Sequence, residues 1–214
     1  MRAISSNEQL VLLEMCKSAD RLTATELSRR IAISVMGASK LLARLEAQRI
    51  LAFERIGSAK RFRIRYESAF VRRFLAFLLH KEAEECEPRV MRWVVDLRRL
   101  DHDASIGILF GSVLIREPRD IDVLLVTEQG SVGALKAAID DLEALAPQPI
   151  HAVLQTREDL VRNVATDPVV ERAARGIVLF GYEDIVEVFA HVTGEKHGRV
   201  VSEPRPSRTR QTRS

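Results

Sequence analysis

The chain has 214 residues, of which 46% are hydrophobic and 29% are charged, and its formal net charge is +3. This is an ordinary globular composition, and the length suits one large domain or two small ones. Neither a signal peptide nor a membrane span is expected, because the N-terminus lacks an uncharged apolar segment and the stretch 104–115 is too short to cross a bilayer.

Charge is distributed unevenly along the chain. Residues 1–80 carry 15 Lys or Arg and 7 Asp or Glu, a net charge of +8, whereas residues 81–201 have a net charge of −8. The final segment, 202–214, returns to +3 and has no apolar side chain except proline, so it is expected to be disordered. A basic N-terminal module beside an acidic one favours different partners, and nucleic acid is the first candidate for the basic module.

The two cysteines, Cys16 and Cys86, lie in helix-like patterns and have no disulfide or zinc-site spacing. We interpret both as reduced thiols, which are typical of a cytoplasmic protein.

The first part of the chain predicts three helices. Residues 6–18 have helical periodicity, and a second helix is expected after Thr23, which can form a capping box with Glu26. Ser34 is a candidate N-cap for a third helix over 35–49, whose apolar stripe consists of Ala38, Leu41, Leu42 and Leu45. The short break before this third helix predicts a helix-turn-helix.

Residues 51–66, LAFERIGSAKRFRIRY, alternate apolar and charged side chains and predict a hairpin with one apolar and one arginine face. Three helices and a basic hairpin resemble a winged helix-turn-helix DNA-binding domain of the MarR-like or ArsR-like kind, over about residues 5–67. The resemblance implies that the third helix enters the major groove and that the hairpin follows the DNA backbone. It places Ser34, Ser39, Lys40 and Arg44 at base edges or phosphates, and Lys60, Arg61 and Arg63 at phosphates. A winged helix that binds only protein is the alternative.

Residues 68–86 and 88–100 predict two connecting helices, the second beginning at Pro88. The first is expected to present one wide apolar face made of Phe70, Phe74, Phe77 and Leu78. Such a face needs a partner, either the C-terminal module or a second copy of the chain. Because DNA-reading winged helices commonly pair on two half-sites, we expect a homodimer.

Beyond the connector, strands are mixed with helices, which predicts an α+β fold. Strands are expected at 104–110, 120–126, 150–156 and 176–181, with helices at 131–145, after 156 and at 183–192. The chain is therefore expected to comprise a winged helix-turn-helix (1–67), a helical connector (68–102), a mixed-sheet domain (103–193) and a basic tail (194–214).

The segment LFGSVLIREPRDIDVLL (109–125) places Gly111-Ser112 after one apolar run and Asp120 and Asp122 before another. Alternate residues of a strand share a face, so the two carboxylates should lie side by side. Two like charges raise each other's pKa unless a cation lies between them, and carboxylate oxygens suit Mg²⁺.

LFGS followed by DIDVLLV resembles the minimal nucleotidyltransferases of the DNA polymerase β superfamily, over about residues 100–190. The resemblance implies that Asp120 and Asp122 bind Mg²⁺ and that Gly111 and Ser112 hold the triphosphate of an NTP, with ATP preferred. Arg116 or Arg119 would contact phosphate. The activity implied is transfer of a nucleotidyl group to an acceptor hydroxyl.

The sequence departs from that family in two ways. The loop between Ser112 and Asp120 is short, and the expected third carboxylate is missing from the strand at 150–156. His151 lies near the position of that carboxylate, and it would either orient an acceptor or be a half-buried strand residue without a role. Glu158 and Asp159, just after the strand, are weak substitutes for the third carboxylate.

Two functions follow from these patterns. One is a DNA-binding, Mg²⁺-dependent nucleotidyltransferase that modifies a protein or small-molecule hydroxyl, with a toxin as one candidate protein partner in a toxin-antitoxin or regulatory system. The alternative is a transcriptional regulator whose catalytically degenerate nucleotidyltransferase fold only binds nucleotide or a partner protein. A structural adaptor is a third interpretation.

Overall fold

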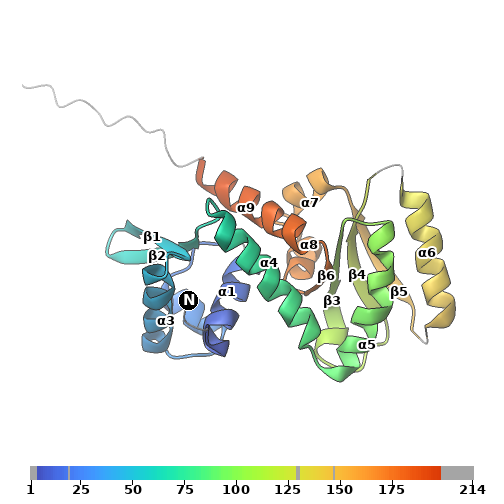
Figure 1. The fold of residues 1–214 in the computed structure, drawn as a ribbon, viewed down its shortest axis with the longest axis horizontal. Helices are drawn as coiled ribbons and strands as arrows, with labels where there is room; N and C mark the ends of the chain where they lie inside the picture. Colours follow the sequence, from blue (N-terminus) through green and yellow to red (C-terminus); the bar gives the residue numbers. More distant parts are fainter. Residues whose placement is uncertain (1–3, 19, 129–130, 147, 199–214) are drawn as a thin grey trace, which may run out of the picture.

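The computed structural model describes residues 4–18, 20–128, 131–146 and 148–198. Figure 1 shows helices and a hairpin at one end of the molecule, a sheet with flanking helices at the other, and the long helix α4 running between them. Most of the expected tail, residues 199–214, lies outside the described residues.

The N-terminal end has the arrangement of a winged helix-turn-helix. Its elements are α1 (Ser6–Ser18), α2 (Ala24–Arg30), α3 (Val35–Ala47), β1 (Leu51–Ile56) and β2 (Ala59–Ile64). The expected capping box is present, since Thr23 and Glu26 exchange hydrogen bonds at the start of α2. Ser34 caps α3 by accepting a hydrogen bond from the Gly37 amide at 3.0 Å. These local signals confirm the predicted helix-turn-helix.

The wing is an antiparallel hairpin in which Phe53 pairs with Phe62 and Arg55 pairs with Lys60. Its inner face is buried, as expected, through Phe62 and Ile64. A bridge from Phe62 to Leu22 ties the hairpin to the segment before α2. The wing is therefore fixed relative to α3 by both packing and backbone hydrogen bonds.

The connector consists of α4 (Ala69–Glu84) and α5 (Pro88–Leu97), followed by the short helix η1 (Arg98–His102). The buried face of α4 agrees with our prediction only in part, because Leu78 is buried and Phe74 packs against the core as expected, whereas the other two aromatic residues do not. Phe70 and Phe77 are 54% and 58% exposed, whereas Leu75 and Leu79 are fully buried. The reason is that α4 packs against α1 on one side and against α9 and β6 on the other, so its buried stripe is set by two neighbours. The C-terminal module of the same chain thus covers the buried side of α4.

The C-terminal end is a four-stranded mixed sheet in the order β5-β4-β3-β6. The strand β3 is antiparallel to β4 and β6, whereas β4 and β5 are parallel. The strands are β3 (Ile106–Phe110), β4 (Ile121–Val126), β5 (Ile150–Gln155) and β6 (Ile177–Phe180), each within two residues of its predicted bounds. This confirms a mixed α+β architecture.

Helices cover both faces of the sheet (Figure 1). Leu109, Val123 and Leu125 pack with α5 and α6 (Val132–Leu145). Ile108, Leu124 and Val126 belong to the core of the opposite face, whose helices are α7 (Arg157–Asn163), α8 (Pro168–Ala174) and α9 (Tyr182–Gly198). The helix α8 was not predicted, and α9 continues past its expected end at residue 192.

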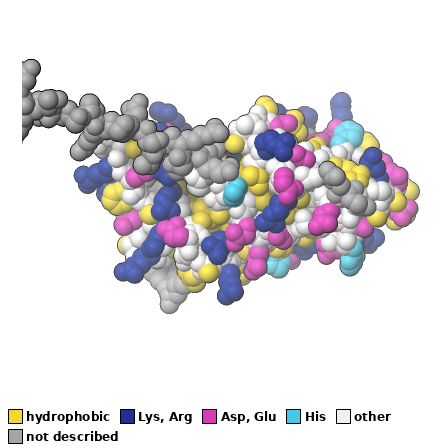
Figure 2. All heavy atoms as spheres, turned by 90° about the horizontal axis from the view of Figure 1, so that it is seen from above, with side chains coloured by type: hydrophobic (Ala, Val, Ile, Leu, Met, Phe, Trp, Pro, Cys, Tyr) yellow, Lys and Arg dark blue, Asp and Glu magenta, His cyan; other side chains and the backbone are white. Residues whose placement is uncertain are grey.

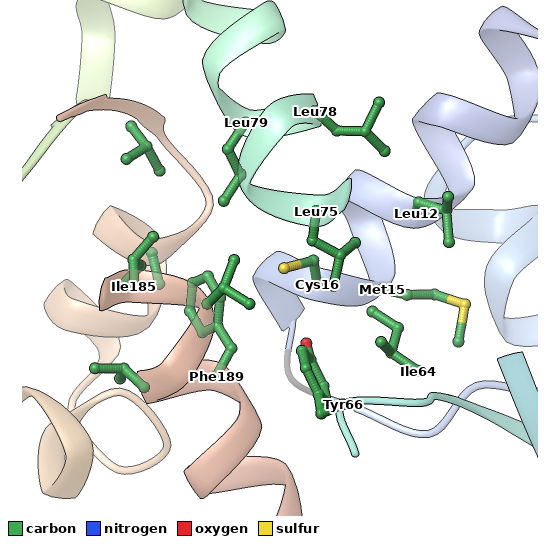
Figure 3. Packing of buried hydrophobic residues seen from close by; sticks show 14 of the residues in the cluster. Leu12, Met15, Cys16, Ile64, Tyr66, Leu75, Leu78, Leu79, Ile185 and Phe189 are labelled. Atoms are coloured by element: carbon green, nitrogen blue, oxygen red, sulfur yellow. The ribbon is translucent and has the colours of Figure 1, made fainter. Parts of the chain in front are cut away.

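The core on this second face is continuous with that of the winged helix. Figure 3 shows Cys16 and Tyr66 from the winged helix beside Leu75 of α4 and Phe189 of α9. Complete burial raises the pKa of the Cys16 thiol to about 12, so this thiol is held protonated, and both cysteines are free thiols. Lys17 adds a polar link, because its Nζ lies 2.6 Å from Glu82 of α4 and donates to the Gly176 carbonyl.

Within the described ranges, no helix has both the length and the apolar composition that a membrane crossing needs.

Candidate nucleic-acid interface and metal site

The exposed side of α3 carries the residues expected to meet DNA. Ser34, Ser39, Lys40 and Arg44 are all exposed, while the opposite side of the helix is buried through Ala38, Leu41, Leu42 and Leu45. This follows from the helical period, which places residues three or four apart on one face. All four residues are therefore accessible, with Lys40 and Arg44 one turn apart on the exposed side of the helix, and their contact with DNA remains a prediction.

The cations near α3 differ in their surroundings. Arg44 Nε lies 3.2 Å from Oε1 of Glu8, a carboxylate that is almost fully buried, so the guanidinium is tethered to α1. Lys40 has no ion pair among the described residues. Of the two, Lys40 is the cation whose charge is available to a polyanion.

The wing shows the same contrast. Arg61 is paired with Glu26 of α2 at 3.3 Å, and Arg63 is paired with Glu67 at 3.0 Å. Lys60 lies near the hairpin turn with its Nζ 4.4 Å from the centre of the Phe53 ring, and it is exposed. Arg55, directly across the hairpin from Lys60, is also exposed and was missed, although its place in the alternating run could have identified it. Figure 2 shows Lys and Arg side chains projecting from the winged-helix end of the molecule.

The two aspartates lie side by side as the strand period predicts. Asp122 is in β4, opposite Phe110 of β3 and paired with His151 of the parallel strand β5. Asp120, Asp122 and His151 each offer one ligand atom, and these atoms lie within 4.8 Å of one another. The imidazole Nδ1 is 3.5 Å from Asp120 Oδ2, and the histidine side chain is 60% exposed. His151 therefore lies on a strand, as expected, beside the two carboxylates, but its side chain is exposed and not half-buried.

The electrostatics of the cluster suit a cation. Burial, followed by the charge of Asp120, raises the pKa of Asp122, while His151 and Arg172 of α8 lower it. The charged form of Asp122 is therefore favoured less by His151 and Arg172 than it is disfavoured by burial and by the charge of Asp120. A divalent cation between the two aspartates would reverse this balance.

The turn after β3 is built around Asp122. Gly111 has φ +82°, and a Cβ at this position would collide with the Asp122 carboxylate, so only glycine lets the turn lie this close to the strand. Residues Gly111–Leu114 form the short helix η2. Ser112 Oγ is buried and has no hydrogen-bond partner among the described residues. A buried hydroxyl without a partner, beside two carboxylates, fits a site that is completed by a polar ligand.

Arg89 of α5 fixes this turn and was missed by the sequence analysis. Its Nη1 donates to the carbonyls of Val113 at 2.7 Å and Arg116 at 2.9 Å, and its Nη2 donates to the carbonyl of Leu114 at 3.2 Å. The guanidinium therefore holds the backbone that follows Gly111-Ser112, while the side chain of Arg116 stays exposed. No local pattern marks Arg89, because the contact depends on how α5 packs on the sheet.

Glu158 and Asp159 do not complete the cluster. They lie at the start of α7, after the end of β5, where they line a separate cavity of about 840 Å³ with Thr127. Asp122 and His151 lie near the beginnings of the same two parallel strands. Because parallel strands begin at one edge of a sheet and end at the other, these acids cannot supply the missing third carboxylate.

Two solved structures are similar to part of the chain. One, described as the crystal structure of the AntR antimony-specific transcriptional repressor, is 29% identical with a TM-score of 0.31, over 38% of this chain and 73% of its own. The other, a MarR family protein from Bacillus stearothermophilus, is 18% identical with a TM-score of 0.33, over 48% of this chain and 76% of its own. No protein-family model and no curated protein matches the chain.

Because both TM-scores are below 0.5, these similarities do not establish the fold. The winged helix is identified from its own elements, α1 to α3 with β1 and β2. Neither of the two proteins is described as a nucleotidyltransferase, and that assignment of residues 103–193 stays a prediction.

Replacing Asp122 by asparagine is expected to stabilise the protein at neutral pH in the absence of divalent cations. The pKa of Asp122 is raised in the folded state, so the charged carboxylate weakens folding once the pH rises through that pKa. Removing the charge should therefore raise the free energy of unfolding near pH 7, and the gain should vanish below about pH 4, where the unfolded chain also binds the proton. Urea unfolding at both pH values, with EDTA present, measures the difference.

Asp141→Asn is the matched control, because Asp141 is exposed on α6. Its effect should be small at both pH values. A loss of stability in Asp122→Asn at neutral pH would contradict the predicted balance of charge and burial.

Proposed function

We propose that this chain is a transcriptional regulator that binds double-stranded DNA through α3 and the β1–β2 wing. The observation that carries the proposal is the exposed face of α3, which presents Ser39 and an unpaired Lys40 beside a wing that ends in Lys60. In a winged helix such a face enters the major groove, and the wing cations contact phosphate. Three arginines are each paired with a carboxylate in the structure, namely Arg44, Arg61 and Arg63. To contact DNA, each would replace that carboxylate by a phosphate as its ion-pair partner.

The proposal includes a cytoplasmic location and a homodimer, because paired winged helices match two half-sites. Phe70 and Phe77 leave an apolar strip on α4 that the part of the chain described by the structure does not cover. Sedimentation at several protein concentrations tests the dimer separately from DNA binding.

DNA binding is tested by fluorescence anisotropy with a mixed-sequence duplex of about 30 bp, at salt concentrations between about 50 and 200 mM. Lys40→Ala and Lys60→Ala should each weaken binding, and each should lower the slope of log affinity against log salt by about one, the value for one lost phosphate contact. Both residues are exposed, so neither change should alter the fold.

Lys136→Ala is the matched control, since Lys136 is exposed on α6 at the opposite end of the molecule (Figure 1). It removes the same charge and should leave the affinity and the slope unchanged. Equal effects of all three changes would mean that net charge, and not this surface, attracts the DNA.

A second function is favoured by one observation, the buried and unpartnered Ser112 Oγ beside the Asp120–Asp122–His151 cluster. We propose that Asp120 and Asp122 hold Mg²⁺ and that Gly111, Ser112 and Arg116 hold the phosphates of an NTP. Bound there, the metal would neutralise phosphate charge as a nucleotidyl group passes to a protein or small-molecule hydroxyl, which gives up its proton, while pyrophosphate leaves. In this arrangement Arg89 keeps the phosphate-binding turn in place, and His151 orients the acceptor or a water molecule. A toxin is one candidate for the modified protein.

Incubation with labelled ATP, Mg²⁺ and candidate acceptors separates the two roles of this site. Label transfer that disappears in Asp120→Ala would support an enzyme. Calorimetric binding of Mg²⁺–ATP without transfer would support a regulator that uses the nucleotide as a signal, which requires different affinities in two states of the protein. No heat of binding with either Mg²⁺–ATP or Mg²⁺–GTP would exclude a nucleotide site.

A further inference from the structure

The first turn of α3 exposes two neighbouring apolar side chains. Val35 is 48% exposed and Met36 is 69% exposed. Both side chains lie outside the buried stripe of α3, which consists of Ala38, Leu41, Leu42 and Leu45. The packing of α3 is provided instead by the stripe that begins at Ala38. Val35 and Met36 are therefore not part of the core of the winged helix.

Single exposed apolar residues are common on protein surfaces and need no explanation. This pair differs by its position. It directly follows the N-cap Ser34, on the helix whose N-terminal residues approach base edges in a helix-turn-helix. Elsewhere in the domain, exposed Phe53 is in contact with neighbours, because Lys60 lies over its ring and the Phe62 ring centre is 5.8 Å away.

The Ser34 hydroxyl of this turn is already engaged as the helix cap. Ser34 Oγ accepts a hydrogen bond from the Gly37 amide at 3.0 Å. A Cβ at Gly37 would lie only 3.1 Å from that oxygen, which is a tight contact. The Ser34 hydroxyl can still donate its hydrogen to DNA, and the apolar side chains beside it at the tip of α3 are the valine and the methionine. On the base edges of the major groove, the apolar group is the C5-methyl of thymine.

We infer that Val35 and Met36 select thymine by covering its methyl group, so that the sites read by α3 contain A·T pairs opposite its N-terminus. The inference rests on the proposed DNA binding and specifies what that surface reads. Val35 shares a helix face with Ser39, and Met36 shares one with Lys40, since each pair is four residues apart. One helical turn is about 5.4 Å and one base pair about 3.4 Å, so a polar contact is expected one or two base pairs from each thymine.

The test begins with selection of duplexes from a random library by the full chain. The selected duplex is then made with thymine and with deoxyuridine, which differs only by lacking the methyl group. Affinity for the deoxyuridine duplex should fall about fourfold for each methyl covered, the equivalent of about 0.8 kcal/mol for one buried methylene. In Val35→Ala/Met36→Ala the two duplexes should bind alike, while Lys136→Ala should discriminate as the wild type does.

Equal affinity of the wild type for both duplexes, or undiminished discrimination by Val35→Ala/Met36→Ala, overturns the inference and leaves DNA binding intact. If no duplex is enriched although the mixed-sequence duplex binds, the inference is overturned and DNA binding stands. If neither enrichment nor binding of the mixed-sequence duplex is seen, both proposals are overturned. Both side chains are exposed and alanine favours helix, so the circular dichroism of the double variant should match that of the wild type.

Discussion

Replacing Gly111 by alanine is expected to lower the free energy of unfolding by about 2–4 kcal/mol, because a left-handed backbone disfavours alanine and the added methyl displaces a neighbour. The backbone of Gly111 has φ +82°, and the new Cβ would collide with the Asp122 carboxylate. Either the turn moves away from β4 or Asp122 moves out of the cluster. Both outcomes should also abolish the proposed binding of Mg²⁺ and nucleotide, measured by calorimetry beside urea unfolding.

Gly133→Ala provides the matched control. Gly133 lies in α6, and a Cβ there would meet nothing within 4 Å. Alanine in an exposed helix position is favoured over glycine by about 0.5–1 kcal/mol, so this change should be neutral or stabilising. If Gly111→Ala were as well tolerated as Gly133→Ala, the close approach of the turn to Asp122 would be wrong.

Leu75→Ala is expected to cost about 2–5 kcal/mol and to destabilise both ends of the molecule together. Leu75 is fully buried in α4, within the core that joins the winged helix to the sheet. Circular dichroism reports on all helices, whereas fluorescence of Trp93, buried between α5 and the sheet, reports on the C-terminal end. Because the core is continuous, the two signals should share one urea midpoint, and that midpoint should fall in the variant.

Phe77→Ala tests the same helix at an exposed position. It removes a larger side chain, but Phe77 is 58% exposed, so stability should change by less than about 0.5 kcal/mol. Separate midpoints for the two signals would show that the ends of the molecule unfold independently. A large loss in Phe77→Ala would instead support the face that the sequence predicted.

Local interactions explain why the winged helix could be predicted. The Thr23–Glu26 capping box and the Ser34 cap act within four residues, and the alternation in 51–66 follows directly from the strand period. The same period placed Asp120 and Asp122 on one face without knowledge of the sheet. Apolar runs in the sequence likewise predicted the bounds of the four strands of the C-terminal sheet to within two residues.

Other features depend on how distant segments pack. His151 joins the aspartates only because β5 runs parallel to β4 in the register that pairs it with Asp122. Arg89 reaches the turn after β3 only because α5 packs on that side of the sheet. The face of α4 was predicted only in part. Phe70 and Phe77 were expected in the buried stripe because they are aromatic, but the contacts of α4 with α1 and α9 leave both of them exposed.

The sequence by itself determined the order of the elements, the caps of the helices and the pairing of two carboxylates on one strand. Each of these depends on backbone period and on hydrogen bonds between residues close in the chain. The tertiary structure decided which cations remain unpaired, which buried hydroxyl lacks a partner and which side of α4 is covered. These depend on contacts between segments far apart in sequence, whose distances are set only when the whole core is packed.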